Sequence, residues 1–145
     1  MFTDEDEEAV ADPHEDVLVV KVVLTWQELN QTLVDGGSSV DILFKQTQDD
    51  LQIGDLRLDP VRASLKGFGE AELIPLGLID LPLTIGSSPL QKTMMVTWVV
   101  VGEPSPYQVI LGRLFNRIVE AVSSTQMQCV KFRVQGGVGV MRGQQ

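Results

Sequence analysis

The chain has 145 residues and a formal net charge of −9 at pH 7, with a single cysteine and a single histidine. Eight acidic residues and no basic residue lie in residues 1–16, so the other 129 residues, with 12 acids and 11 bases, are close to neutral. These figures exclude an intrachain disulfide framework, a metal site of several histidines and cysteines, and a basic surface for nucleic acid. The length predicts one domain, and the single cysteine fits a reducing, intracellular and cytoplasmic compartment. No apolar run approaches the ~20 residues of a membrane-spanning helix.

The first third of the chain predicts strands that follow a charged tail. Residues 1–16 carry like charges, which is typical of a disordered acidic tail or linker. Residues 17–24 are rich in β-branched side chains and predict a strand, and a turn at 25–28 leads into a second arm at 29–34. Residues 40–44 predict the next strand, and residues 45–53 are expected to form a short helix or turn.

The middle of the chain predicts a hairpin and two long strands. In residues 65–71, two glycines bracket Phe68 between strand-like flanks, which indicates a mobile hairpin tip or, alternatively, an ordinary turn with a buried Phe68. Residues 73–85 predict a strand in which Pro75 and Pro82 belong at bulges or edges, because proline donates no ladder hydrogen bond. Residues 94–101 predict a buried strand.

The last third predicts the one convincing helix, at residues 113–121, with Leu114, Ile118 and Ala121 at helical spacing. A short buried strand at 109–112 precedes it, and the alternation of residues 128–134 predicts a half-buried strand. Residues 136–145 contain too much glycine to pack alone, so we expect a domain at 17–135 followed by a glycine-rich linker. Many short strands and one late helix predict a small all-β barrel or sandwich.

Asp35 is the candidate catalytic residue, because it ends a strand and enters the loop Gly36-Gly37-Ser38-Ser39. Glycine lets the backbone approach closely, and a bent backbone can turn N–H groups toward the carboxylate and stabilise it. The alternative is a surface hairpin, since Asp-Gly is a strong hairpin signal. The loop is not a phosphate loop, because no lysine follows its glycines, and its serines lack a histidine for a Ser-His triad.

The order of these motifs resembles the retropepsin-like aspartic proteases, and most of all the protease segment of plant gypsy-type LTR retrotransposon gag-pol polyproteins. The resemblance covers nearly the whole chain and implies an all-β fold, a small closed barrel with one short C-terminal helix and one lobe per chain. The stretches that carry it are Pro13-His14-Glu15-Asp16 with the strand after it, 33–39 with Asp41-Ile42-Leu43, Leu65-Lys66-Gly67-Phe68, Ile110-Leu111-Gly112-Arg113, and Val140-Met141-Arg142-Gly143.

The resemblance implies an aspartic endopeptidase that uses two facing aspartates and an activated water, without a metal or cofactor. Only Asp35 lies in the required turn, so the second aspartate would come from a second copy in a homodimer. A polypeptide is the implied substrate, with neither nucleic acid nor membrane as a partner. The other implied roles are a flap at residues 66–71 (Lys66, Gly67, Phe68, Gly69), support of the active-site loop by Ile110, Leu111 and Gly112, and a dimer strand at Cys129–Val134.

Gly36 departs from the family pattern, in which threonine, serine or asparagine follows the aspartate. A hydroxyl at this position bonds across the dimer, and losing such a bond costs about 0.5–1.5 kcal/mol per copy. We therefore expect a weaker dimer, a looser aspartate pair and impaired activity. Two alternatives stay open: a catalytically inactive retropepsin-like dimerisation or peptide-binding module, and an unrelated all-β binding domain in which Asp35 is a hairpin residue. The packing of loop 35–39 against Gly112 distinguishes the last one.

Overall fold

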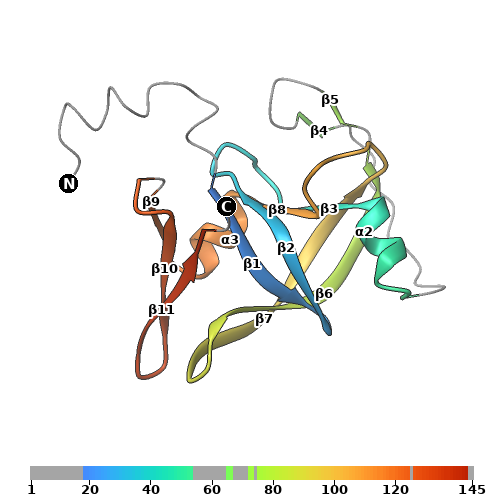
Figure 1. The fold of residues 1–145 in the computed structure, drawn as a ribbon. Coiled ribbons are helices and arrows are strands. Elements are labelled where there is room, and N and C mark those ends of the chain that lie inside the picture. Colours follow the sequence, from blue (N-terminus) through green and yellow to red (C-terminus); the bar gives the residue numbers. More distant parts are fainter. Residues whose placement is uncertain (1–17, 54–64, 67–71, 74, 125, 144–145) are drawn as a thin grey trace.

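The computed structural model describes residues 18–53, 65–66, 72–73, 75–124 and 126–143 (Figure 1). Its helices are α2 (Lys45–Asp50) and α3 (Arg113–Ile118). Its strands are β1 (Leu18–Leu24), β2 (Gln27–Val34), β3 (Ile42–Phe44), β4 (Leu65–Lys66), β5 (Glu72–Leu73), β6 (Pro75–Ser87), β7 (Leu90–Val101), β8 (Val109–Leu111), β9 (Val122–Ser124), β10 (Cys129–Val134) and β11 (Gly137–Arg142).

Six strands close into a barrel in the order β1-β2-β8-β3-β7-β6. The barrel closes where the end of β1 pairs with β6, at Val23 opposite Thr84 and Leu24 opposite Leu83. Strand β2 runs parallel to β8, and β3 runs parallel to β7. The short β8 lies between β2 and β3, although it comes much later in the sequence. Two parallel neighbours such as β2 and β8 cannot be joined by a tight hairpin, so a long connection separates them in the chain.

Strand β1 shows why the predicted strands form. Its residues alternate between the barrel interior and the outside, with Leu18, Val20, Val22 and Leu24 almost fully buried and Lys21 exposed. Alternate side chains of a strand point to opposite faces, so this spacing covers one face with apolar groups. The turn that follows is shorter than predicted, because β2 already begins at Gln27.

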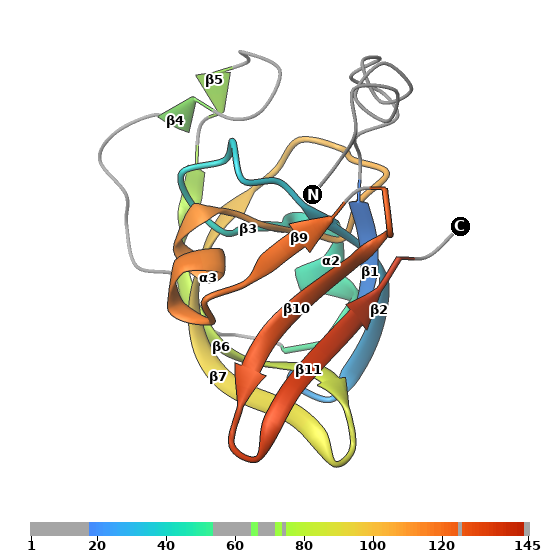
Figure 2. The ribbon, with the colours of Figure 1, turned by 90° about the vertical axis from the view of Figure 1, so that its left-hand side faces the viewer.

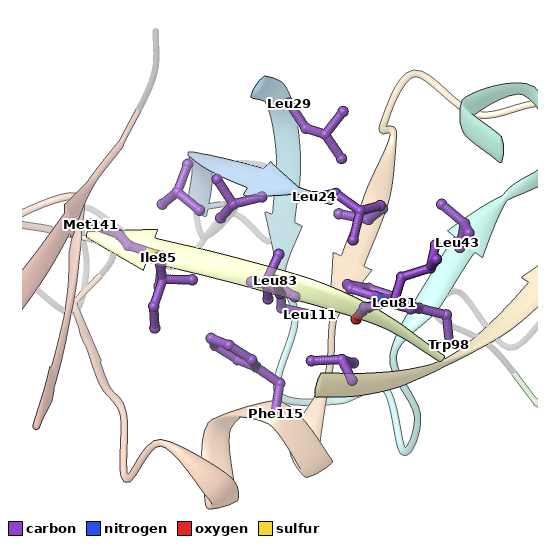
Figure 3. Packing of buried hydrophobic residues seen from close by; sticks show 14 of the residues in the cluster. Leu24, Leu29, Leu43, Leu81, Leu83, Ile85, Trp98, Leu111, Phe115 and Met141 are labelled. Atoms are coloured by element: carbon purple, nitrogen blue, oxygen red, sulfur yellow. Dashed lines mark hydrogen bonds between the residues drawn. The ribbon is translucent and has the colours of Figure 1, made fainter. Parts of the chain in front are cut away.

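The long hairpin β6–β7 forms two neighbouring strands of the barrel and supplies much of its core. Trp98 of β7 and Leu83 of β6 are fully buried, and Phe115 of α3 packs into the same cluster (Figure 3). Each such side chain contributes about 1.5–3 kcal/mol through burial. The ladder shifts register next to Pro75, as expected for a proline at a bulge, whereas Pro82 lies within the ladder opposite Met95.

A second sheet, β9-β10-β11, lies beside the barrel (Figure 2). Strand β11 occupies residues that we expected to belong to a glycine-rich linker, and it pairs with β10 along its full length, from Gly137 opposite Val134 to Arg142 opposite Cys129. Met141 of β11 is 2% exposed and belongs to the main core (Figure 3). Residues 137–142 are therefore part of the folded body, because β10 supplies the hydrogen bonds that this segment lacks by itself.

Helix α3 begins where predicted but ends at Ile118 rather than at residue 121, and the predicted apolar face is not its buried face. Leu114 and Ile118 are 46% and 60% exposed, whereas Phe115 and Val119 are 1% exposed and belong to the core. Apolar side chains occur on more than one side of this short helix, so their spacing does not indicate which side faces the barrel. A second short helix, α2, occupies part of the segment where a helix or turn was expected.

Candidate functional site

Asp35 follows the last residue of β2 and is held by strand β8. Its N–H donates to the carbonyl oxygen of Leu111 at 3.0 Å, which extends the parallel β2–β8 ladder by one hydrogen bond beyond the pair Val34–Leu111. Asp35 is neither buried nor fully exposed. The carboxylate therefore sits at the open end of a strand whose backbone position is set by the barrel.

The turn after Asp35 wraps its backbone around the carboxylate. The Gly37 N–H donates to Asp35 Oδ1 at 2.9 Å, and the Ser38 N–H donates to the Asp35 carbonyl oxygen at 3.1 Å. A Cβ on Gly37 would lie only 3.1 Å from Asp35 Oδ1, so the missing side chain allows this approach. A donor thus faces the carboxylate, as expected for a turn that stabilises and orients an acid.

Gly36 has a different environment from Gly37. A Cβ added at Gly36 would meet nothing within 4 Å. The glycines with left-handed φ among the described residues are Gly86 and Gly136, so the turn at Gly36 needs no such backbone conformation. Within one chain, residue 36 therefore tolerates a side chain.

The loop then packs tightly on the corner between β8 and α3. The Arg113 N–H donates to the Ser38 carbonyl oxygen at 2.8 Å, and the Gly112 N–H donates to Asp41 Oδ1 at 2.7 Å. A Cβ on Gly112 would overlap the Val40 carbonyl oxygen and lie 2.7 Å from the Ser38 carbonyl oxygen. Gly112 is thus the point at which the loop and the corner approach too closely for any side chain.

Within the loop, Ser38 is buried and stabilises the backbone of the turn. It is 1% exposed, and its hydroxyl group donates to the Val40 carbonyl oxygen at 2.7 Å. Ser39 is exposed. Of the residues predicted for this site, the structure brings Asp35, Gly37, Ser38, Leu111 and Gly112 into one hydrogen-bonded unit. A free surface hairpin would not pack against Gly112 in this way, so the alternative of a simple hairpin does not describe this loop.

The structure adds Asp41, which the sequence analysis did not select as a site residue. It is 2% exposed and is the one acidic or basic residue with a buried side chain among the described residues. Burial raises the pKa of its carboxyl group, and backbone hydrogen bonds from Gly112 and Phe115 oppose this rise. The available signal in the sequence was an acid between the apolar residues Val40 and Ile42.

An apolar cluster packs against the end of β2 that Asp35 follows. Leu33 lies on β2, two positions before Asp35, which follows the end of this strand. Leu33 packs with Ile42, Val99 and Ile110 in a second core cluster, separate from the main one. Tyr107 is one of the partly buried residues at its margin.

The predicted flap is described only at its base. Strands β4 and β5 pair antiparallel, with Leu65 opposite Leu73 and Lys66 opposite Glu72, as expected for the two arms of a hairpin. Figures 1 and 2 both place this pair at the end of the barrel where the loop between β2 and β3 lies. Residues Gly67, Phe68 and Gly69 of the predicted tip lie outside the described residues, as does the tail at 1–16.

The predicted dimer strand is paired along the whole of one edge and along half of the other. Strand β11 pairs with all of Cys129–Val134, and β9 pairs with Cys129–Lys131, so among the described strands only Phe132–Val134 keep an unpaired edge. Among the described strands, β9 forms an outer edge of this sheet. Exposed apolar side chains lie on β9 and on the preceding helix, namely Val122 at 68%, Ile118 at 60% and Leu114 at 46% exposure.

The described residues contain no cluster of three or more histidine, cysteine, aspartate or glutamate side chains suited to a metal ion. Cys129 is a buried free thiol. Within the same residues, no helix has the length and apolar character needed to cross a membrane.

Two solved structures resemble the chain closely in fold. The retroviral protease-like domain of Ddi1 from Leishmania major matches with a TM-score of 0.60 and 17% identity, over 86% of this chain and 92% of that one. A retropepsin-like aspartic protease from Rickettsia conorii matches with a TM-score of 0.50 and 17% identity, over 86% of this chain and 87% of that one. No protein-family model and no curated protein matches the sequence. The chain thus has the retropepsin-like fold, an all-β closed barrel with few helices.

Proposed function

We propose that this domain is a retropepsin-like aspartic endopeptidase that acts as a homodimer, with one Asp35 from each copy. The observation that carries the proposal is the loop of Asp35, which wraps Gly112 and hydrogen-bonds to Leu111 within a barrel of this fold. A simple hairpin turn would not need this support from a strand far away in the sequence.

In the proposed reaction, two Asp35 carboxyl groups face each other across one water molecule. Two like charges so close cannot both be ionised, so the pair shares one proton. The ionised carboxylate accepts a proton from the water, whose oxygen forms a bond with the scissile carbonyl carbon, while the other carboxyl group protonates the carbonyl oxygen. Collapse of this intermediate breaks the C–N bond: the carboxyl group that took the proton of the water protonates the leaving nitrogen, and a hydroxyl proton of the intermediate returns to the other carboxylate. One water is thus consumed per bond, and the aspartate pair again shares one proton. The Gly37 N–H orients Asp35 for this step.

We propose that the second aspartate comes from another copy, because Asp35 is the only aspartate of the sequence that begins an Asp-Xaa-Gly motif. Asp41 is buried and bonded to Gly112, and Asp80 lies exposed on β6, where it accepts a hydrogen bond from Thr97. For the contact between copies we propose β9 and the exposed side of α3, because β11 covers one edge of β10 and β9 covers Cys129–Lys131 of the other. A two-fold contact through β9 would bury Val122, Ile118 and Leu114.

The proposed substrate is an extended polypeptide with apolar residues beside the cleaved bond. The apolar cluster around Leu33 and Ile110, with Tyr107 at its margin, is buried and packs against the end of β2 that Asp35 follows. The hairpin based on β4 and β5 would close over the peptide as a flap. From the order of motifs in the sequence, we propose the gag-pol polyprotein of a plant gypsy-type LTR retrotransposon as the natural substrate.

Gly36 favours a second candidate function, a retropepsin-like module that dimerises or binds peptides without cleaving them. A threonine at residue 36 would meet open space within the chain, so its hydroxyl group would be free to reach a partner copy. Gly36 offers no such group, and the aspartate pair loses a bond from each copy. Gly36→Thr is therefore expected to tighten the dimer and to raise activity.

Cleavage of a mixed peptide library at mildly acidic pH tests the proposal. The wild type would be compared with Asp35→Asn, with Asp80→Asn as a matched control, and with a transition-state-mimicking inhibitor of aspartic proteases. Activity that persists in Asp80→Asn but is lost in Asp35→Asn and with the inhibitor supports catalysis by Asp35. Activity that appears only with Gly36→Thr supports an intact fold with a weakened aspartate pair. Silence in every variant contradicts catalysis and favours the binding module.

A further inference from the structure

Asp41 links the loop after Asp35, the corner between β8 and α3, and strand β7 through hydrogen bonds. Its side chain accepts the Gly112 N–H at 2.7 Å, and its backbone carbonyl oxygen accepts the Val99 N–H at 2.9 Å. The first bond leads to the corner between β8 and α3, and the second leads to β7. Because Asp41 is only 2% exposed, water does not compete for these bonds.

Helix α3 depends on this loop for its first turn. The first N–H groups of a helix have no partner within the helix and need acceptors from elsewhere. Gly112 stands at the N-cap position and has no side chain to serve as one. The loop supplies the acceptors instead: Asp41 Oδ1 for the N–H of Gly112 and the Ser38 carbonyl oxygen for the N–H of Arg113.

We propose that Asp41 is a positioning residue, whose buried carboxyl group holds Gly112 and thereby fixes the loop that carries Asp35 against β8 and α3. The link runs in both directions. Asp35 donates to Leu111, the neighbour of Gly112, so any movement of Gly112 displaces the backbone partner of Asp35. Because α3 also carries the exposed Ile118, Asp41 connects the proposed dimer surface to the position of Asp35. The catalytic consequence rests on the proposed function, whereas the structural consequence does not.

Amide hydrogen exchange tests the structural part without any assay of activity. Asp41→Ala removes the acceptor, and Asp41→Asn keeps an acceptor oxygen of the same reach but not the charge. We expect exchange at Gly112, Asp35 and Arg113 to be roughly ten-fold faster in Asp41→Ala and less affected in Asp41→Asn, with amides of β10 unchanged. Asp80→Asn, the same change at an exposed site, is the control and should leave all of these amides unchanged.

Unchanged exchange at these three amides in folded Asp41→Ala would overturn the proposal. If Asp41→Ala does not fold, the amide proton resonance of Gly112 in Asp41→Asn decides. A carboxylate polarises a donor more strongly than an amide oxygen does, so we expect an upfield shift, and an unchanged resonance would contradict the proposed contact.

Peptide cleavage tests the positioning role itself. We expect Asp41→Asn to lower kcat by about ten-fold or more with little change in KM, because a misplaced carboxylate affects the reaction more than peptide binding. Met141→Ala, which weakens the core through β11, should not produce this split, and an equal loss of kcat in both variants would refute positioning. If the wild type cleaves nothing while exchange responds as expected, the proposed function fails and the structural role of Asp41 stands.

Discussion

Replacing Gly112 with alanine probes the contact on which the candidate site depends. The added methyl group would overlap the Val40 carbonyl oxygen and lie 2.7 Å from the Ser38 carbonyl oxygen. Both obstacles are backbone atoms, so no side chain can rotate away to make room. The loop must therefore move away from the corner between β8 and α3.

The expected cost follows from the overlap and from the bonds that the movement breaks. Overpacking a tight site costs about 1–3 kcal/mol. The bonds from Gly112 to Asp41 and from Arg113 to Ser38 are at risk, each contributing about 0.5–1.5 kcal/mol. Gly112→Ala should thus lower the free energy of unfolding by roughly 2–6 kcal/mol, a large part of the 5–15 kcal/mol typical of a domain.

Urea unfolding at a fixed protein concentration measures this change, and Gly36→Ala is the matched control. The methyl group at residue 36 meets open space, so this variant should stay within about 0.5 kcal/mol of the wild type or gain slightly in stability. The fixed concentration keeps any dimer contribution equal. If both variants have the same free energy of unfolding, the loop does not pack on Gly112 as described, and the reasoning about the site is refuted.

Three further predictions concern the core, the buried acid and the proposed dimer surface. Met141→Ala should cost about 2–5 kcal/mol in urea unfolding, because this residue is 2% exposed, and a neutral result would place β11 outside the core. The raised pKa of Asp41 means that the folded state binds more protons than the unfolded state above about pH 3.8, so the wild type should lose stability relative to Asp41→Asn as pH rises from 4 to 7. A pH-independent difference in their unfolding free energies would contradict this. Ile118→Glu should weaken self-association in sedimentation equilibrium, whereas Trp26→Glu, also exposed but on the β1–β2 turn, should not; equal effects would count against the proposed surface.

For the pH prediction, the charged groups on the elements around Asp41 lie toward solvent. Asp35 on the same loop is partly exposed, and Arg113 and Arg117 on α3 are exposed. Lys45, which follows β3, pairs with Asp49 on α2. Burial thus dominates the pKa of Asp41, and the sign of the predicted change follows from desolvation of a charged carboxylate.

Local sequence patterns specify most of the barrel strands, the Asp35 loop and the class of fold. Alternation along Leu18–Leu24 and Cys129–Val134 is a local property, and it predicts which side chains face inward. The glycine-rich turn after Asp35 also reflects local chemistry, because the Gly37 N–H reaches the Asp35 carboxylate at a position where a Cβ would lie only 3.1 Å from Oδ1. The ordered set of motifs then indicated the retropepsin-like barrel that the structure has.

Which groups those elements meet depends on contacts between segments that are distant in the sequence. Asp41 becomes a buried partner of Gly112 because β8 and α3, about seventy residues later, close over it. Strand β11 forms because β10 offers its edge, which no property of the glycine-rich segment reveals. On α3, Phe115 is buried in the core and Leu114 is exposed. Both side chains are apolar, so only the side on which the barrel lies decides which of them is buried. Such outcomes depend on contacts between distant segments, and local spacing carries no information about them.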